Sequence, residues 1–327
     1  MRRNLHAGRR RREGVGVSVF TADDCEDVHL ATLEVLQQTG VYVEDAKARA
    51  LFASAGCDVK DERGVVKIPP DVVDEAVRSA PPIVLFAGRD PANDVMVGGD
   101  RVGFTNFGEA PLLIDPQSGE QRPATKADVG EAARVCDAMS EVDVFEMALN
   151  AHDVPPETAD VHHVEAALAN TTKCVCAATM SWEESEAAWD LAAAIVGGRD
   201  ELRRRPIVFE GACPVSPLKL HREFTDPVIS AAKAGVPNVV ITCAMAGATT
   251  PIHLAGALVV HNAEVLSSMT LVQLASKGAP VVYGSSTTAM DLRYATASVG
   301  TPEATLINAA VAQMARYYSV PSWVAGA

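Results

Sequence analysis

Aromatic side chains and positive charge are both scarce in this 327-residue sequence. Only 5% of its residues are aromatic, and its formal net charge is −14. Six of the 28 lysines and arginines fall within the first twelve residues, so 22 basic residues face 42 acidic ones in the remainder. A protein body this acidic repels phosphate backbones, and we therefore expect no nucleic-acid partner.

Signals for export, membrane insertion and disulfide formation are also missing. No apolar core follows the N-terminal arginines, as a secretory signal requires, and no run approaches the roughly 18 apolar residues of a membrane span. The seven cysteines are odd in number and scattered, which is typical of reduced thiols. We expect a cytoplasmic protein without membrane contact, and we interpret residues 1–20 as a basic tail.

Phosphate loops and metal spacings are absent as well. Neither Gly-x-Gly-x-x-Gly nor Gly-x-x-x-x-Gly-Lys occurs. His152, Asp153, His162 and His163 could suggest a metal site, but adjacent helical histidines diverge and nothing completes a zinc spacing. We interpret this group as a polar loop and helix face, and we assign no metal site.

The first hundred residues mix helices with short extended pieces. The sequence predicts helices from Thr21 to about Gln38, over Ala46–Ala55 and from Pro69 to near Ala80. Between and after them lie the expected extended pieces Val65–Ile68, Ile83–Phe86, Asp94–Val97 and Arg101–Phe107. We therefore expect an N-terminal α+β cap region over residues 21–120.

Strands and helices alternate regularly beyond Thr125. Six apolar strands are expected to begin near residues 142, 174, 207, 238, 280 and 320, and Arg101–Phe107 is a possible seventh. A closed parallel barrel needs about eight strands, and a doubly wound sheet usually carries a glycine-rich loop. The pattern thus predicts an α/β fold in which residues 121–327 form a (β/α)8 TIM barrel, incomplete at the C-terminus.

Two features near the expected strand ends invite functional readings. In a parallel barrel the active site lies at the carboxyl ends of the strands. Cys213 could be a nucleophile there, although a role in the core or in lining a cavity is favoured. Asp291 and Arg293 fall in a long loop over the barrel mouth, where a functional role and a simple ion pair within the loop are about equally supported. His261 and Glu264, three residues apart on a long apolar helix, are interpreted as a polar pair in mutual contact.

Five stretches together resemble the trimethylamine–corrinoid methyltransferases, over essentially the whole chain from about residue 20. Each is weak alone, and the combination is specific. The stretches are Ala31–Val41, Pro214–Leu218, Ala246–Ala257 with Asn262–Leu266, Tyr283-Gly284 with Met290–Arg293, and Gly300–Glu303 with Tyr317–Pro321.

The resemblance implies a (β/α)8 barrel that moves a methyl group from trimethylamine to the cobalt of a separate corrinoid protein. This chain would then bind no cofactor itself, because the corrinoid (cobalamin) is carried by the partner protein. We also expect a homo-oligomer. In pyrrolysine-containing members that residue follows a segment like Val320–Ala327, which implies pyrrolysine directly after Ala327. No catalytic group would then lie within the chain, and this N-terminal fragment would be inactive alone.

The family includes a second substrate class, which stays open here. Pyrrolysine's electrophilic imine can add trimethylamine and make its nitrogen quaternary, whereas glycine betaine is already quaternary and needs no such residue. A pyrrolysine-free glycine betaine-type enzyme and a catalytically inactive fragment are therefore the alternatives. Cys213 stands where the resemblance leads us to expect a polar amide. Strand-end position and resemblance together suggest six substrate-binding residues: Asn106, Glu109, Met245, Ser285, Asp291 and Arg293.

Overall fold

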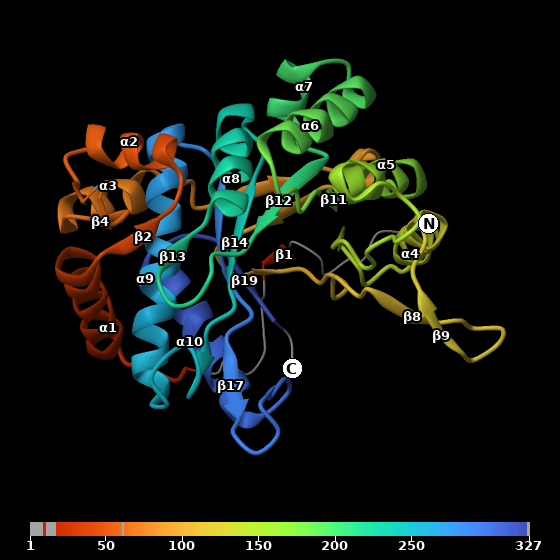
Figure 1. The fold of residues 1–327 in the computed structure, drawn as a ribbon. Helices are drawn as coiled ribbons and strands as arrows, with labels where there is room; N and C mark the ends of the chain where they lie inside the picture. The colour runs from red at the N-terminus through yellow and green to blue at the C-terminus, as the bar shows by residue number, and fades with distance from the viewer. Residues whose placement is uncertain (1–8, 11–17, 61, 326–327) are drawn as a thin grey trace.

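The computed structural model describes residues 9–10, 18–60 and 62–325 (Figure 1). Its first helix, α1 (Ala22–Glu34), begins at the predicted capping box, in which Thr21 and Asp24 bond each other's backbone N–H groups. A short π-helix (Val35–Thr39) extends it to Gly40, whose φ of +79° favours glycine. The helices α2 (Ala46–Ser54) and α3 (Pro70–Ser79) follow as predicted.

Six strands form one sheet in which every neighbouring pair is parallel. In sheet order they are β10 (Val144–Phe145), β11 (Cys174–Cys176), β12 (Val208–Ala212), β14 (Asn238–Thr242), β16 (Val281–Ser285) and β19 (Ser322–Val324). The six predicted strands are therefore confirmed. The described residues form a parallel half-barrel.

The possible seventh strand is only partly correct. Within it, β7 (Arg101–Val102) pairs antiparallel with β1 (Arg9–Arg10). A single parallel bridge then joins Thr105 to Val144 at the edge of the main sheet. The segment thus reaches the sheet edge without forming a regular strand there.

Helices connect the strands of the half-barrel, as the alternation predicts. They are α4 (Lys126–Ala138), α5 (Ala159–Asn170), α6 (Trp182–Val196), α7 (Arg199–Arg204), α8 (Arg222–Ala234), α9 (Leu254–Ala275) and α10 (Pro302–Tyr317). Figure 1 shows α1, α2 and α3 gathered beside α9, on the side away from α4 and α5.

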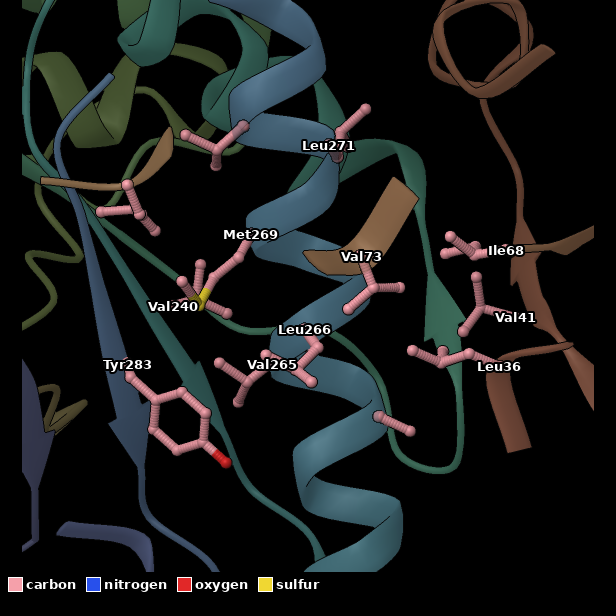
Figure 2. Close-up of a cluster of buried hydrophobic side chains, with 14 of the residues drawn as sticks. Leu36, Val41, Ile68, Val73, Val240, Val265, Leu266, Met269, Leu271 and Tyr283 are labelled. Atoms are coloured by element: carbon pink, nitrogen blue, oxygen red, sulfur yellow. The ribbon is translucent and has the colours of Figure 1, made fainter. Parts of the chain in front are cut away.

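The helix α9 corrects one expectation from the sequence. Among the described residues it is the one helix long and apolar enough to cross a membrane by length and composition, yet 78% of its most apolar window is buried within the protein. Figure 2 shows why: side chains from the N-terminal region and from the sheet surround it. The apolar composition of α9 is therefore explained by burial in the core.

Residues from both sides of the expected domain boundary near residue 120 pack into this one core. The boundary therefore stays a prediction.

An N-terminal hairpin fills the amino end of the sheet's concave face. Its strands β5 (Val84–Phe86) and β6 (Val95–Val97) pair antiparallel, and the N–H of Ala87 donates to the carbonyl of Pro206, just before β12. The ring of Phe86 lies 5.0 Å from that of Phe209 and 6.0 Å from that of Trp323. The hairpin thus closes this end, and space for a ligand remains at the carboxyl end.

The remaining strands are short and lie mostly in loops. Their ranges are β2 (Val41–Val43), β3 (Asp58–Lys60), β4 (Val65–Lys67), β8 (Leu112–Ile114), β9 (Gln121–Pro123), β13 (Lys219–Leu220), β15 (Met245–Ala246), β17 (Thr288–Asp291) and β18 (Thr296–Ala297). Among them β13, from the loop after β12, pairs in parallel with β2 and so ties that loop to the N-terminal sheet.

Candidate functional site

A cavity of about 550 Å³ lies at the carboxyl ends of β10, β11 and β12. This is the edge at which a parallel α/β fold is expected to carry its site. Among the residues that the structure describes, three carboxylates and three histidines line it and no lysine or arginine does: Glu109, Asp160 and Glu223 with His152, His163 and His221. The electrostatic potential of this cavity therefore favours a cation.

Glu146 lies beside the cavity, one residue beyond β10. The pKa of its carboxyl is raised to about 7, mainly by burial; a hydrogen bond from the Cys176 thiol lowers it and the negative charge of Glu109 adds to the rise. Its Oε2 is buried and has no hydrogen-bond partner among the described residues. Buried carboxylate oxygens are normally hydrogen-bonded, so this unpaired atom indicates a missing polar or charged partner.

Gly211 provides the room for this arrangement. It lines the cavity from β12, and a Cβ at this position would lie 2.8 Å from the Cys176 Sγ and 3.7 Å from the Glu146 Oε1. Any larger residue would displace the thiol that donates to Glu146. The glycine is therefore a requirement of packing around the carboxyl.

Glu109 lies on the cavity wall. Although the residue as a whole is exposed, loss of solvent around its carboxyl raises its pKa; the negative charge of Asp160 adds to this effect and His163 opposes it. Mutual repulsion between such carboxylates is relieved when a cation binds between them. Glu109 is thus well placed to contact a cationic ligand.

His163 is held in one orientation by two neighbours. Its Nε2 accepts the N–H of Ala151 at 2.9 Å, so in the neutral ring the proton resides on Nδ1. Nδ1 faces the Asp160 carboxylate at 3.6 Å. Both ring nitrogens are engaged within the protein, and His163 acts by positioning Asp160 on the cavity wall.

Glu210, on β12, is fully buried. Its oxygens accept the Thr179 N–H at 3.0 Å and the Thr179 hydroxyl at 2.8 Å. Burial raises the pKa of this carboxyl well above its ordinary value, and the two hydrogen bonds oppose that rise. Because both oxygens are occupied by Thr179, Glu210 fixes the loop after β11.

Comparison with known proteins identifies the family of this chain. The family model described as trimethylamine methyltransferase (MTTB) matches residues 5–327. The chain belongs to the trimethylamine methyltransferase family. It is 44% identical over 326 residues to the trimethylamine methyltransferase MttB of Desulfitobacterium hafniense (strain DSM 10664 / DCB-2), covering 100% of this chain and 66% of that protein.

Other relatives differ in similarity and in name. The trimethylamine methyltransferase MttB of Methanosarcina thermophila is 40% identical and is covered to 68% of its length, together with 99% of this chain. The chain thus spans about two thirds of the length of these curated relatives. A glycine betaine methyltransferase of Desulfitobacterium hafniense (strain Y51) is 29% identical, with 93% of this chain and 63% of that protein covered.

A solved structure supports the fold of this family member. The monomethylamine methyltransferase of Methanosarcina barkeri superposes with a TM-score of 0.54 at 14% sequence identity, covering 95% of this chain and 69% of that chain. At this identity the likeness concerns the fold alone. The α/β architecture with a parallel barrel-type sheet is therefore confirmed, while closure into a complete barrel stays a prediction.

Of the six predicted substrate-binding residues, Glu109 is the one that the structure places on the cavity wall. The side chain of Asn106 serves the backbone instead. Its Nδ2 donates to the Glu146 carbonyl at 2.8 Å and to the Phe107 carbonyl at 3.0 Å, and its Oδ1 accepts the Glu146 N–H at 3.0 Å. Asn106 thereby holds the Glu146 backbone in place.

Two other predicted residues lie farther along the strand edge. Met245 lies on β15, where its carbonyl accepts three successive N–H groups of the next turn. Ser285 is fully buried at the end of β16, and its hydroxyl accepts the Thr287 N–H at 3.0 Å. Both are engaged in local backbone structure.

Asp291 and Arg293, both within the described residues, form no ion pair with each other. The Asp291 carboxylate accepts the N–H groups of Arg293 at 2.8 Å and of Tyr294 at 3.3 Å, which closes the turn after β17. The ion-pair interpretation is therefore replaced by a carboxylate-capped turn, a common use of aspartate in loops.

The histidine interpretations are partly confirmed. As expected for a polar loop, Asp153 accepts the Lys126 N–H at 2.7 Å and His162 contacts the Lys126 Nζ at 2.8 Å. The expected mutual contact of His261 and Glu264 is wrong. His261 bonds Thr287, and Glu264 accepts from Ser216 and from the Leu218 N–H, because loops after two different strands reach α9. Cys213 lines the cavity, as favoured.

Sequence reasoning missed Glu146, the acid that the structure singles out. Its signal was present, because Val144, Glu146 and Ala148 alternate along an apolar segment and place a carboxyl on one face of a buried strand. An acid inside such a run is rarely buried without a function or a partner. The position of Asp160 and His163 at the cavity could not be predicted in the same way. A helix carries both residues, and the local sequence does not determine how that helix is oriented relative to the sheet.

Proposed function

We propose that this chain forms the amine-binding part of a methyltransferase that transfers a methyl group from trimethylamine to the cobalt of a separate corrinoid protein. Family membership and the names of the relatives support the reaction class. The observation that carries the substrate class is the cavity at the ends of β10, β11 and β12, whose described lining residues include carboxylates but no lysine or arginine. Trimethylamine is protonated at neutral pH, so its charge matches this wall.

The same observation disfavours glycine betaine as the substrate. Glycine betaine carries a carboxylate of its own, which needs a cationic or N–H-donating partner when it leaves water. Glu109 and Asp160 would repel it. The lower identity to the glycine betaine enzyme, 29% against 44%, points in the same direction.

Within this chain, the work of the site is to bind and orient the amine. Glu109 and Glu146 would hold the ammonium group, and the backbone bonds from Asn106 would fix the position of Glu146. Holding one N-methyl group toward the open carboxyl end lets the corrinoid partner approach it in line. The corrinoid protein would supply the cobalt that accepts the methyl group, while Glu109 and Glu146 would hold the amine, whose nitrogen would keep the electron pair of the broken C–N bond.

Binding selectivity tests this proposal on the 327-residue protein. Calorimetric titrations should show trimethylamine binding at least tenfold more tightly than glycine betaine, and E109Q should weaken trimethylamine binding by about the same factor. The matched control E131Q, on the exposed face of α4, should bind like the parent. Preference for glycine betaine, or equal affinity of E109Q and the parent, would contradict the assignment.

Two further expectations concern the reaction beyond binding. The enzyme expressed from the complete gene should demethylate trimethylamine only when a corrinoid protein is supplied. We also propose, from the resemblance to pyrrolysine-containing members, that pyrrolysine follows Ala327, and the codon at that position tests this directly. An amber codon with an in-frame continuation would agree, whereas a sense codon for another amino acid would overturn it.

A further inference from the structure

Two of the seven cysteines differ from the others in exposure and position. Cys25, Cys57, Cys136, Cys174 and Cys176 are buried, whereas Cys213 and Cys243 are exposed. Cys213 directly follows β12 and Cys243 directly follows β14, two strands that neighbour each other in the parallel sheet. Both exposed thiols therefore lie at the carboxyl edge of the sheet.

The two thiols contact each other as well as the site. The Cys213 and Cys243 side chains lie within hydrogen-bonding reach of one another, and the Ser286 hydroxyl reaches Cys243 from the loop after β16. The Cys213 Sγ also donates to the Pro214 carbonyl at 3.5 Å. Cys213 also lines the acidic cavity. Thiols in hydrogen-bond contact on adjacent strands need only a small movement to reach the bonding distance of a disulfide, about 2.05 Å.

We propose that Cys213 and Cys243 form an oxidant-sensitive dithiol at the cavity, which peroxides convert reversibly into a disulfide. In the first step the Cys243 thiolate attacks one peroxide oxygen, the O–O bond breaks, and the leaving oxygen takes a proton as water or an alcohol. In the second step the Cys213 sulfur attacks the Cys243 sulfenic acid, forming the S–S bond and releasing water. A small dithiol returns both cysteines to the reduced state.

The electrostatic environment assigns different roles to the two sulfurs. The hydrogen bond from Cys213 lowers the pKa of Cys243, and the Ser286 hydroxyl lowers it further against the effect of burial. The same interaction raises the pKa of Cys213, with burial acting in the same direction. Since the thiolate is the nucleophile, Cys243 reacts first and Cys213 resolves the intermediate.

Oxidation of the 327-residue protein with stoichiometric hydrogen peroxide tests this proposal. Trypsin cleaves between the two cysteines at Lys219 and Lys233, so a disulfide joins two otherwise separate peptides. Mass spectrometry without reduction should find the Cys213–Cys243 linkage as the main product, and dithiothreitol should remove it. Circular dichroism before and after oxidation checks that the fold persists.

Variants separate the roles of the two sulfurs. C213S should accumulate a sulfenic acid at Cys243 that dimedone traps, C243S should react with peroxide at least tenfold more slowly, and the buried-site control C57S should form the linkage like the parent. Independent oxidation of the two cysteines, or another pairing in a protein that stays folded, would overturn the proposal. These outcomes do not depend on amine binding, so failure here leaves the proposed function untouched.

Discussion

At the scale of single residues, the carboxyl of Glu146 connects the sequence to the chemistry. The alternation along the segment after residue 142 orients it, the Asn106 amide fixes its backbone, and Gly211 leaves space for the thiol that bonds it. Its raised pKa and its unpaired Oε2 follow from burial. Burial of an acid destabilises the fold once the acid is ionised, so its retention is consistent with a ligand-binding role.

This residue makes the stability of the protein depend on pH. The pKa of Glu146 is about 7 in the folded state, against an ordinary value of 4.5 for a glutamate carboxyl in water, so the folded protein binds more protons between these two pH values. The stability associated with the protonated Glu146 carboxyl is fully present below pH 4.5. It is lost as pH rises through 7 and the buried carboxyl ionises, which lowers the free energy of unfolding by roughly 3 kcal/mol at most. Urea denaturation should show E146Q gaining stability relative to the parent between pH 5 and pH 8. E131Q should show no such gain. If the difference in unfolding free energy between E146Q and the parent is the same at pH 5 and pH 8, the raised pKa of Glu146 is contradicted.

Gly211 offers a second test at this scale. A methyl group at this position would lie 2.8 Å from the Cys176 Sγ, so G211A should lower the free energy of unfolding by about 1–3 kcal/mol through overpacking. Removing the sulfur in G211A/C176A should recover part of that loss. Equal free energies of unfolding in urea for G211A and the parent would contradict the close packing of Gly211 against Cys176.

At the scale of elements, local signals sufficed for the helices and for the strands of the main sheet. The capping boxes at Thr21 and Thr125 mark helix starts, and apolar runs mark all six parallel strands. The short strands β13 and β15 were not predictable, because their pairing depends on contacts distant in sequence. The same reason limits the prediction of the six substrate-binding residues. Their position at strand ends correctly indicated that Glu109 lies at the cavity, but it could not show which of the other side chains form hydrogen bonds to nearby backbone groups instead.

The junction of four elements depends on the amide of Asn262. Its Nδ2 donates to the Thr32 hydroxyl at 2.9 Å and to the Tyr318 hydroxyl at 2.8 Å, and its Oδ1 accepts the Tyr283 hydroxyl at 2.5 Å. N262A should cost roughly 3 kcal/mol or more, because it leaves buried hydroxyls unpaired. T32V, which removes one partner, should cost roughly 1 kcal/mol. Equal urea midpoints for the two variants would argue against this network.

At the scale of the whole molecule, the half-barrel has two different ends. The hairpin β5–β6 and the rings of Phe86, Phe209 and Trp323 fill the amino end of the concave face. The carboxyl end carries the acidic cavity, the thiol pair and the loops. This polarity agrees with the family's barrel-type fold. The carboxyl end of the sheet is therefore the side from which a methyl acceptor would approach the cavity.

The central claim is that the cavity binds trimethylamine as a cation beside Glu146. Because Glu146 has a pKa of about 7, a bound cation should ionise it and release about half a proton at pH 7. Calorimetric titration with trimethylamine in buffers of different ionisation enthalpy measures this release. We expect the parent to release about half a proton more than E146Q on binding trimethylamine, and to bind trimethylamine at least tenfold more tightly. Equal proton release and equal affinity in the two proteins would contradict it.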